Sequence, residues 1–300
     1  MDQKILYFIN PASGPKKKAS PEKVIADATR KREIDFEFAY TNALGNYPLL
    51  IDKIKAEHIT DVVICGGDGS INQVVSFLID IDVNVGIIPM GSGNGLALAA
   101  GIPRQIGKAL ELIFNGSSSY IDAFYINDKF SCMLSGLGFD AQVAHDFATH
   151  PKRGLYTYIQ QTLKNFINAT PYAFDITIKG QSFTTEAFFI SIANSNQFGN
   201  NFKIARKAIL DDGMLDIIVV KKMSKLMLLW SVIRHVFAGE VRRSDELNHK
   251  SEVLYLQAEK VLIHNYTMAP LHVDGEPVET YKHLDIQIIP SAFKLIRPQQ

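Results

Sequence analysis

A run of glycines around one aspartate is the first feature of this sequence that suggests a binding or catalytic site. Gly66, Gly67 and Gly69 flank Asp68, directly after the strand-like apolar run Asp61–Cys65 and before a helix-like segment. Glycines let a backbone turn sharply and approach a ligand closely, and the amides at the start of a helix attract phosphate. The turn lacks the Gly-Lys-Ser/Thr ending of a Walker loop and the last glycine of a dinucleotide fingerprint. It therefore indicates a phosphate-binding turn of another kind, with a tight turn that binds nothing as the simpler alternative.

Asp68 sets this turn apart, because a carboxylate among phosphate-binding amides repels phosphate. The carboxylate suits a nucleotide site if it holds a metal ion, accepts a proton from a nucleophile or contacts a ribose hydroxyl. Asp68 is therefore a candidate catalytic residue. The alternative is a solvated aspartate in a tight turn.

Two more glycine-bearing turns follow strand-like segments. Residues 89–96, with three glycines, follow the apolar run Asn84–Ile88, and Asn10–Gly14 follows the run Lys4–Ile9. Neighbouring parallel strands end at the same edge of a sheet, where open α/β sheets bind ligands. Each turn alone is a weak signal, but the three together predict a nucleotide-binding cleft.

Alternating strand and helix signals position these turns. Helices are predicted over about 20–32, 46–57 and 70–79, with a further strand at Asp35–Tyr40. Strands separated by helices pair in parallel, so residues 1–120 are expected to form an α/β domain. After the linker-like segment Gly116–Ser119, strand signals dominate and predict a β-rich domain over residues 121–300, interrupted by helices over about 154–169 and 225–238. The strands predicted there are Tyr120–Ile126, Phe130–Ser135, Ala173–Lys179, Phe183–Ala193, Met214–Val220, Val253–Gln257, Val261–His264 and Asp285–Ile289.

The composition excludes several classes of protein. The 300 residues are 47% hydrophobic and 21% charged, which excludes a disordered chain, a collagen and a coiled coil. Thirty-one basic residues balance thirty-one acidic ones, so no overall field attracts nucleic acid. Two cysteines make no disulfide framework, which is typical of a reducing cytoplasm. The apolar run near the N-terminus is too short for the core of a signal peptide, and the apolar stretch Leu226–Val236 is too short to span a bilayer. A cytoplasmic protein is expected.

Together these motifs resemble one protein family. The order Asn-Pro-x-Ser-Gly, Gly-Gly-Asp-Gly-Ser and Pro-x-Gly-Ser-Gly-Asn resembles the diacylglycerol kinase catalytic-domain family, which includes bacterial lipid kinases and sphingosine kinases. Gly136–Ala141, Asp211–Asp216 and Val273–Pro277 resemble its later landmarks, so the likeness covers nearly the whole chain. It implies an ATP-binding domain similar to NAD kinases and phosphofructokinases, followed by a β-sandwich over the lipid, from which the last strand can return to the first domain. It also implies transfer of the γ-phosphoryl group of ATP to the hydroxyl of diacylglycerol or a sphingoid base.

The resemblance also implies a set of site residues. Glu276 matches the acid usually assigned as the base that deprotonates the lipid hydroxyl, whereas in sphingosine kinases the aspartate matching Asp68 has that role, so both stay open. Without the resemblance, Glu276 is more simply the tip of a hairpin. Mg²⁺ is expected with ATP, and a structural Mg²⁺ is implied at the Asp212 carboxylate and the carbonyls of Ile209 and Met214, with a plain turn as the alternative. The expected ATP contacts are Asn10, Pro11, Ala12, Ser13, Gly14, Thr41, Gly66, Gly67, Asp68, Gly69, Ser70, Ile71, Asn72 and Ser92.

Departures from the family pattern leave the substrate open. Ser70 stands where diacylglycerol-type bacterial members have threonine, and Gly95 replaces an acid found in many of them, closer to the wording of sphingosine kinases. An NAD kinase, which shares the Gly-Gly-Asp-Gly turn, and a non-catalytic lipid- or nucleotide-binding regulator are the alternatives. The expected partners are the lipid substrate and, transiently, a membrane surface, with no nucleic acid and with a homodimer left open.

Overall fold

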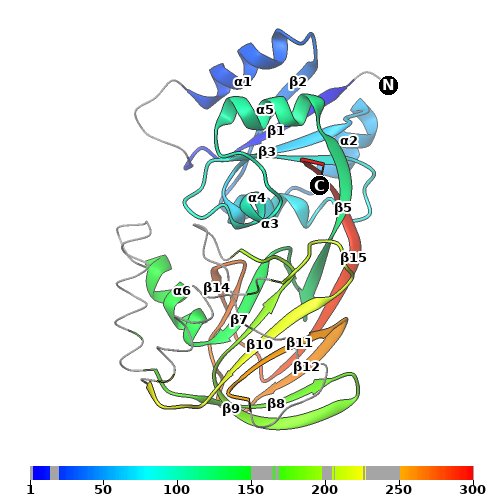
Figure 1. Cartoon of the computed structure of the whole chain (residues 1–300). Helices are drawn as coiled ribbons and strands as arrows, with labels where there is room; N and C mark the ends of the chain where they lie inside the picture. The colour runs from blue at the N-terminus through cyan, green and yellow to red at the C-terminus, as the bar shows by residue number, and fades with distance from the viewer. Residues whose placement is uncertain are drawn as a thin grey trace. The chain divides into compact units, whose positions relative to one another are not determined.

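A computed structural model describes residues 3–13, 20–149, 165, 169–197, 205, 207–225, 227 and 251–299 (Figure 1). The chain divides into two units, the first made of Met1–Ile121 and Ser291–Gln300 and the second of Asp122–Pro290. The chain passes from one unit to the other within two strands, β5 (Ser117–Ile126) and β15 (His283–Arg297). The predicted fold class, an α/β domain followed by a β-rich domain, is confirmed.

The first unit is built on a parallel sheet with the strand order β2-β1-β3-β4-β15. The end of β15 joins this sheet by pairing Lys294 with Asn84 at the start of β4. Two strands have the predicted bounds and two extend one residue further. The four strands are β1 (Lys4–Ile9), β2 (Asp35–Tyr40), β3 (Asp61–Gly66) and β4 (Asn84–Pro89).

Helices pack against both faces of this sheet (Figure 1). Alternate residues of a strand point to opposite faces, so Tyr7 contacts one layer and Phe8 the other. Tyr7 belongs to a buried cluster with Ile25 of α1 and Leu110 of α5. Phe8 meets the ring of Tyr47 edge-on at 5.2 Å between centroids. The helices are α1 (Pro21–Arg30), α2 (Leu50–Glu57), α3 (Asp68–Val75), α4 (Gly95–Ala99) and α5 (Ile106–Asn115).

Three predicted helices have different bounds in the structure. The first ends at Arg30, two residues early, and α2 begins at Leu50 instead of Asn46, because a proline at 48 disfavours helical geometry in the residue before it. The third, α3, covers Asp68–Val75 rather than 70–79. It ends where the Ser76 hydroxyl donates to the Gln73 carbonyl, a local bond that competes with continued helix. Asp68 is therefore the first helical residue.

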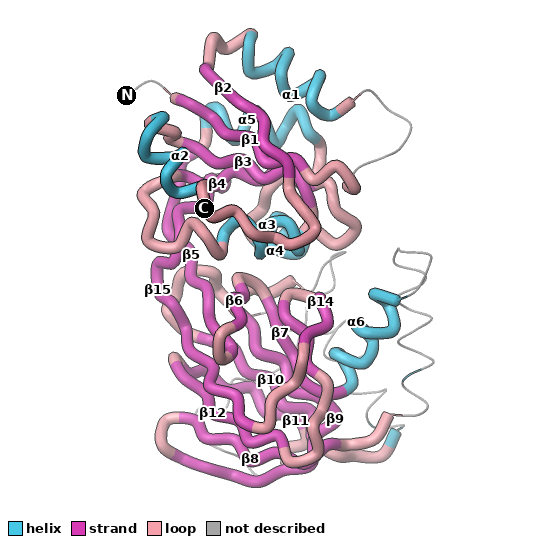
Figure 2. The backbone as a smooth tube through the Cα atoms, turned by 180° about the vertical axis from the view of Figure 1, so that it is seen from behind, coloured by secondary structure: helices cyan, strands magenta, loops and turns pink. Residues whose placement is uncertain are grey.

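In its described residues, the second unit contains antiparallel strands and the helix α6 (Phe139–Thr149) (Figure 2). Its strand order is β14-β13-β7-β9-β8-β12-β15, with β10 paired to β9 and β11, and β5 paired to β15 and β6. A buried apolar cluster that includes Phe124, Phe174, Ile217 and Leu256 forms the core. The strands are β6 (Lys129–Ser131), β7 (Leu134–Gly138), β8 (Tyr172–Ile178), β9 (Gln181–Ala193), β10 (Leu215–Lys221), β11 (Val253–Ala258), β12 (Lys260–Asn265), β13 (Leu271–Val273) and β14 (Glu276–Val278).

Several predictions for this half need correction. Ser117–Ser119, predicted as linker, belong to β5, because pairing with β15 overrides their turn-like composition. The single strand predicted over Phe130–Ser135 is two strands, β6 and β7, and the short pair β13 and β14 was missed. The helices predicted over 154–169 and 225–238, with the apolar stretch Leu226–Val236, lie almost entirely outside the described residues. Among the described helices, none has the length and apolar character needed to cross a bilayer.

Candidate functional site

The three glycine-bearing turns of the first unit lie at one edge of its sheet, as the strand pairing requires. The turn after β1 is joined to β3 by the Asn10 amide, which donates to the Cys65 carbonyl at 3.0 Å. The turn after β4 is joined to β3 by the Met90 amide, which donates to the Gly66 carbonyl at 2.8 Å. The Thr41 amide donates to the Ile9 carbonyl at 2.9 Å, so the end of β2 lies at the same edge. Residues far apart in sequence therefore converge on one site.

Two of these turns touch backbone to backbone at Gly67 and Gly91. A Cβ placed on Gly91 would lie 2.5 Å from the Gly67 Cα, and a Cβ on Gly67 would lie 3.0 Å from the Gly91 Cα. Both distances are shorter than ordinary contacts of a methyl group. Neither glycine has a positive φ, so the close approach of the two turns is the reason that both positions exclude a side chain.

Asn10 ties the first turn to the glycine turn of β3. Its Nδ2 donates to the Ser70 hydroxyl at 2.8 Å, and its Oδ1 accepts the Ala12 amide at 2.9 Å. The Ser13 hydroxyl donates to the Asn10 carbonyl at 3.0 Å and closes the turn. A Cβ on Gly66 would lie 2.7 Å from the Ser70 side chain, so this serine sits directly against the glycine backbone. The side chain of Asn10 thus shapes two turns at once.

Asn94 shapes the turn after β4. It adopts a left-handed conformation with φ of 54°, and its side chain holds both polar groups of Gly91: Oδ1 accepts the amide at 2.9 Å and Nδ2 donates to the carbonyl at 2.8 Å. Asparagine tolerates this conformation better than most residues. Ser92, a predicted ATP contact, is exposed at the tip of the turn. Asn94 was not among the predicted site residues, although its place one residue after Gly93 was a usable signal.

Asp68 lies at the start of α3, with Gly67 in an extended conformation before it. Its carboxylate is half-buried, and Oδ1 accepts the Leu96 amide of α4 at 3.4 Å. The carboxylate therefore lies between the first residues of two helices, at the edge where the three turns meet. This position suits a group that contacts a phosphate-bound metal ion or a reacting hydroxyl.

The thiol of Cys65, at the end of β3, takes no part in this chemistry. It is fully buried in the cluster between the sheet and α1 and α5. Burial raises the pKa of the Cys65 thiol, because the thiolate would lose its hydration. The prediction of a small core residue fits this environment.

In the second unit, Glu276 begins β14 just after a tight hairpin. Val273 and Glu276 are paired, and the two turn residues, Asp274 and Gly275, have φ of 49° and 84°. Asp-Gly is a favoured pair for such a turn. The hairpin that was the alternative interpretation of this segment is therefore present, with Glu276 next to its tip and not at it. The Glu276 side chain is exposed, while the described Asn10, Ser70 and Asp68 lie in the other unit.

Asp274, two residues before Glu276, is a structural residue of this hairpin that was not among the predicted site residues. It is 6% exposed, yet its carboxylate accepts the Ser131 hydroxyl at 2.6 Å and the backbone amides of Cys132, Met133 and Leu134 at 3.0–3.1 Å. A buried carboxylate with this many donors is well satisfied. The hairpin that carries Glu276 is therefore fixed, through Asp274, to the segment between β6 and β7.

The predicted structural metal residues lie in one turn before β10. The Asp212 carboxylate accepts the Met214 amide at 3.1 Å, and the side chain of Ile209 is half-exposed. A second carboxylate, that of the buried Asp122, accepts the Gly213 amide at 2.7 Å. No group of three or more His, Cys, Asp and Glu side chains suited to a metal is found in the described part of the chain. The predicted set uses one carboxylate with backbone carbonyls, so its oxygen chemistry fits a hard cation, and the site stays a prediction.

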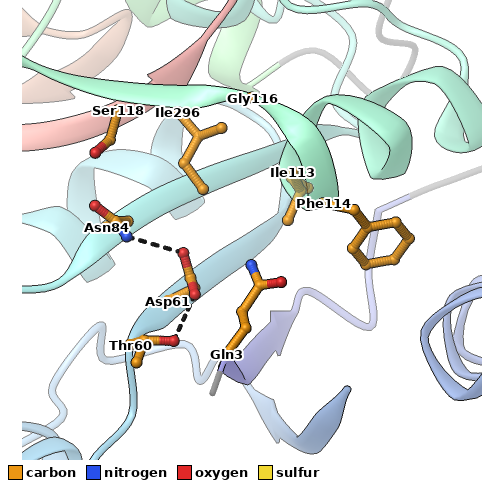
Figure 3. A pocket seen from close by; sticks show the side chains of 9 residues that line it. All are labelled: Gln3, Thr60, Asp61, Asn84, Ile113, Phe114, Gly116, Ser118 and Ile296. Carbon is orange, nitrogen blue, oxygen red and sulfur yellow. Dashed lines mark hydrogen bonds between the residues drawn. The ribbon is translucent and has the colours of Figure 1, made fainter. Parts of the chain in front are cut away.

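A cavity of about 350 Å³ lies at the other end of the strands (Figure 3). Asp61 and Asn84 are the first residues of β3 and β4, and the Asp61 carboxylate accepts Thr60 Oγ1 at 2.6 Å and Asn84 Nδ2 at 3.1 Å. Ile113, Phe114 and other residues complete the lining. None of the residues of the three glycine turns lines this cavity, so it is distinct from the candidate site.

The predicted nucleotide contacts are thus brought together by the first unit, with one exception outside the described residues. The described contacts lie at or just after strand ends at a single sheet edge: Asn10–Ser13, Thr41, Gly66–Asn72 and Ser92. Gly14 lies outside the described residues.

Comparison with known proteins agrees with this architecture. Residues 4–126 match the family described as the diacylglycerol kinase catalytic domain, and residues 134–297 match the family described as the YegS C-terminal NAD kinase beta sandwich-like domain. A curated relative from Shewanella frigidimarina, named "Probable lipid kinase YegS-like", is 29% identical over 287 residues, which cover 92% of this chain and 88% of the relative. A diacylglycerol kinase from Staphylococcus carnosus is 27% identical over 281 residues, covering 91% and 88%.

The solved structures give the same fold. A diacylglycerol kinase from Bacillus anthracis aligns with a TM-score of 0.74 over 98% of this chain and 97% of its own, at 20% identity. At that identity the likeness shows the fold alone. An α/β unit with glycine turns followed by a β-rich unit, matched by these two families, is the architecture of a two-domain class of kinases. With the two family matches, the chain belongs to the diacylglycerol kinase and YegS-like lipid kinase family.

Proposed function

We propose that this protein is an ATP-dependent lipid kinase that transfers the γ-phosphoryl group of ATP to the hydroxyl of diacylglycerol or a sphingoid base. One observation carries the proposal: two glycine turns in backbone contact at the carboxyl edge of the sheet, with Asp68 at the helix start beside them. Family membership supports the same activity.

The nucleotide is expected to bind over the three turns of the first unit. The turn glycines let the phosphates approach the backbone, and the eight-residue helix α3 directs its first amides to the same place. Asn10 and Ser70 hold each other at 2.8 Å and keep the first two turns in register for this contact. Thr41 and Ser92 offer hydroxyls at the same edge.

Magnesium is expected to arrive with ATP. Asp68 is a half-buried carboxylate among the turns, and the oxygen ligands of a carboxylate, phosphates and water suit Mg²⁺. When bound, the ion neutralises charge on the phosphates, which is most of what catalysis of phosphoryl transfer requires. We also propose that a structural Mg²⁺ binds at the turn of Asp212.

The transfer also needs a base for the lipid hydroxyl. As the hydroxyl oxygen bonds to the γ-phosphorus and the bond to ADP breaks, the hydroxyl proton passes to a carboxylate. Glu276 and Asp68 are the two candidates, and the one that acts must come within about 3 Å of the hydroxyl, directly or through one water. A lipid acceptor further implies transient contact with a membrane surface during catalysis.

The test is transfer of labelled γ-phosphate from ATP and Mg²⁺ to lipids in mixed micelles. The panel contains diacylglycerol, monoacylglycerol, phosphatidylglycerol, sphingosine, dihydrosphingosine and ceramide, with NAD in a separate reaction. Asp68→Asn and Glu276→Gln are compared with Glu279→Gln, which removes an exposed carboxylate three residues from Glu276. Loss of a general base lowers rates by about 10²–10⁴-fold. Phosphorylation of one lipid should therefore be lost in Asp68→Asn or Glu276→Gln and retained in Glu279→Gln.

Two results would overturn the proposed activity, and a third would contradict its mechanism. Formation of NADP from NAD without lipid labelling would identify an NAD kinase. ATP binding by folded protein without transfer to any acceptor would identify a regulator. Full lipid labelling by both Asp68→Asn and Glu276→Gln would exclude both candidate bases, while lipid kinase activity would stand.

A further inference from the structure

A buried histidine precedes the hairpin that carries Glu276. His272 lies in the middle of β13 and has no exposed surface. Its Nδ1 accepts the amide of Gly275, the second turn residue, at 3.2 Å. Because Nδ1 is the acceptor, the ring carries its proton on Nε2. His272 is therefore hydrogen-bonded to the hairpin at the residue directly before Glu276.

The other ring nitrogen faces a carboxylate from a different element. Asp140, in the first turn of α6, is 6% exposed, and its Oδ2 lies 3.5 Å from His272 Nε2. This distance is long for a hydrogen bond, so the contact is mainly electrostatic, and it strengthens in a buried setting. The other carboxylate oxygen accepts the Ala141 amide at 2.8 Å, which holds the side chain in place.

Gly136 makes room for this pair. It lies opposite His272 in the pairing of β7 with β13. A Cβ on Gly136 would lie 2.1 Å from Asp140 Oδ2 and 2.9 Å from His272 Nε2. Asp140 and His272 thus meet across the bare backbone of Gly136. This contact gives a physical reason for the first glycine and the aspartate of the Gly-Leu-Gly-Phe-Asp segment, which the nucleotide site leaves unexplained.

The hairpin is consequently held on both sides. The carboxylate of Asp274, the first turn residue, accepts hydrogen bonds from the segment between β6 and β7. His272 binds the second turn residue through its ring, and α6 supports the ring through Asp140. A second contact, between His145 Nε2 of α6 and the Leu271 carbonyl at 3.3 Å, joins the same helix to β13. Glu276 follows this doubly anchored turn without an intervening residue.

We infer that Asp140 and His272 are positioning residues that set the location of the Glu276 carboxylate for proton acceptance. The inference rests on the proposed function with Glu276 as base. His272 acts through its Nδ1 contact with Gly275, and Asp140 fixes the ring that makes this contact. Displacing a catalytic group by about 1 Å lowers a rate by as much as 10²-fold, so a loss of about 10- to 100-fold is expected when the acceptor for the Gly275 amide is removed.

Two substitutions at His272 separate its two ring nitrogens. Asparagine places a side-chain oxygen near the position of Nδ1, so His272→Asn keeps an acceptor for the Gly275 amide. Glutamine places its amide near Nε2, so His272→Gln loses that acceptor. We expect His272→Gln to lower kcat at least 10-fold with the KM for ATP unchanged, and His272→Asn to retain most of kcat. Gly136→Ala, which displaces the pair without removing either polar group, should act as His272→Gln does and replaces it if that variant does not fold.

A double variant distinguishes positioning from general stability. If His272 acts only through Glu276, then adding His272→Gln to Glu276→Gln causes no further loss of kcat. Folding of each variant is checked by urea denaturation, and kcat is expressed per folded molecule. A further loss in the double variant, or equal kcat in His272→Gln and His272→Asn, would overturn the inference.

The outcome for Glu276→Gln alone separates this inference from the proposed function. If the labelled lipid is still phosphorylated at full rate by Glu276→Gln, Glu276 is not the base and the positioning inference falls, while lipid kinase activity stands. If no acceptor is phosphorylated by the unchanged protein, the proposed function itself fails.

Discussion

The contact between Gly67 and Gly91 allows a sharp test of how the nucleotide site is built. In Gly91→Ala, the new Cβ would start 2.5 Å from the Gly67 Cα and 2.9 Å from Asn94 Oδ1. Ordinary contact begins at 3.4 Å, so the two turns must separate by about 0.9 Å. Because Gly91 has no positive φ, the backbone conformation itself is available to alanine, and the effect is steric.

The size of the effect follows from this displacement. Inserting a methyl group into a closely packed site costs about 1–3 kcal/mol. A shift of about 1 Å in groups that position a reactant lowers a rate by up to about 10²-fold. We therefore expect Gly91→Ala to lose about 1–3 kcal/mol of unfolding free energy and to reduce kcat/KM for ATP by about 10- to 100-fold.

The matched control is Gly107→Ala in α5, where a Cβ meets no heavy atom within 4 Å. Alanine is the better helix former by up to about 1 kcal/mol, so this variant should be unchanged or more stable and fully active. Urea denaturation measures the unfolding free energy, and calorimetric titration with ATP measures binding independently of the acceptor lipid. Equal stability and equal ATP affinity in Gly91→Ala and Gly107→Ala would refute the steric argument.

Three further outcomes are expected. In a double-mutant cycle of Asn10→Ala and Ser70→Ala, the 2.8 Å hydrogen bond between the side chains should give a coupling of about 0.5–1.5 kcal/mol in unfolding free energy, and additive losses would contradict it. Burial raises the pKa of the Tyr7 phenol, whose hydroxyl lies 2.8 Å from the Thr29 hydroxyl, so the folded state favours the neutral phenol. The contribution of this phenol to stability is therefore present below pH about 10 and is lost as the pH rises further. Tyr7→Phe should therefore flatten the fall of stability above pH about 10, as measured by urea denaturation, and an unchanged slope would argue against this contribution. Cys65 and Cys132 are both fully buried, and burial raises the pKa of Cys65, so neither should react with a thiol reagent at pH 8 until denaturant is added; rapid labelling of native protein would disprove their burial.

The sheet of the first unit could be predicted because its signals are local. The predicted strands Lys4–Ile9 and Asp35–Tyr40 have the same bounds as β1 and β2, and each glycine turn lies where a strand ends. Such features depend on the residues of one short segment and on the rule that parallel strands end at one edge. The convergence of Asn10, Ser70 and Gly91 on that edge is therefore a consequence of the sequence pattern.

Elements whose form depends on distant partners were predicted less well. Ser117–Ser119 have the composition of a linker, but they extend β5, which pairs with β15 near the other end of the chain. The short strands β13 and β14 carry too few residues for a periodic pattern, and the turn between them is held by the contact of Asp274 with the distant Ser131.

The class of fold, the order of the motifs and the family they resemble all follow from the amino-acid sequence alone. The contact of Asp140 with His272 over Gly136 depends on the packed fold, since these residues are brought together by the pairing of β7 with β13 and by the start of α6. Local propensity acts over a few neighbouring residues, whereas a buried polar contact between residues 140 and 272 exists only after the strands between them have packed.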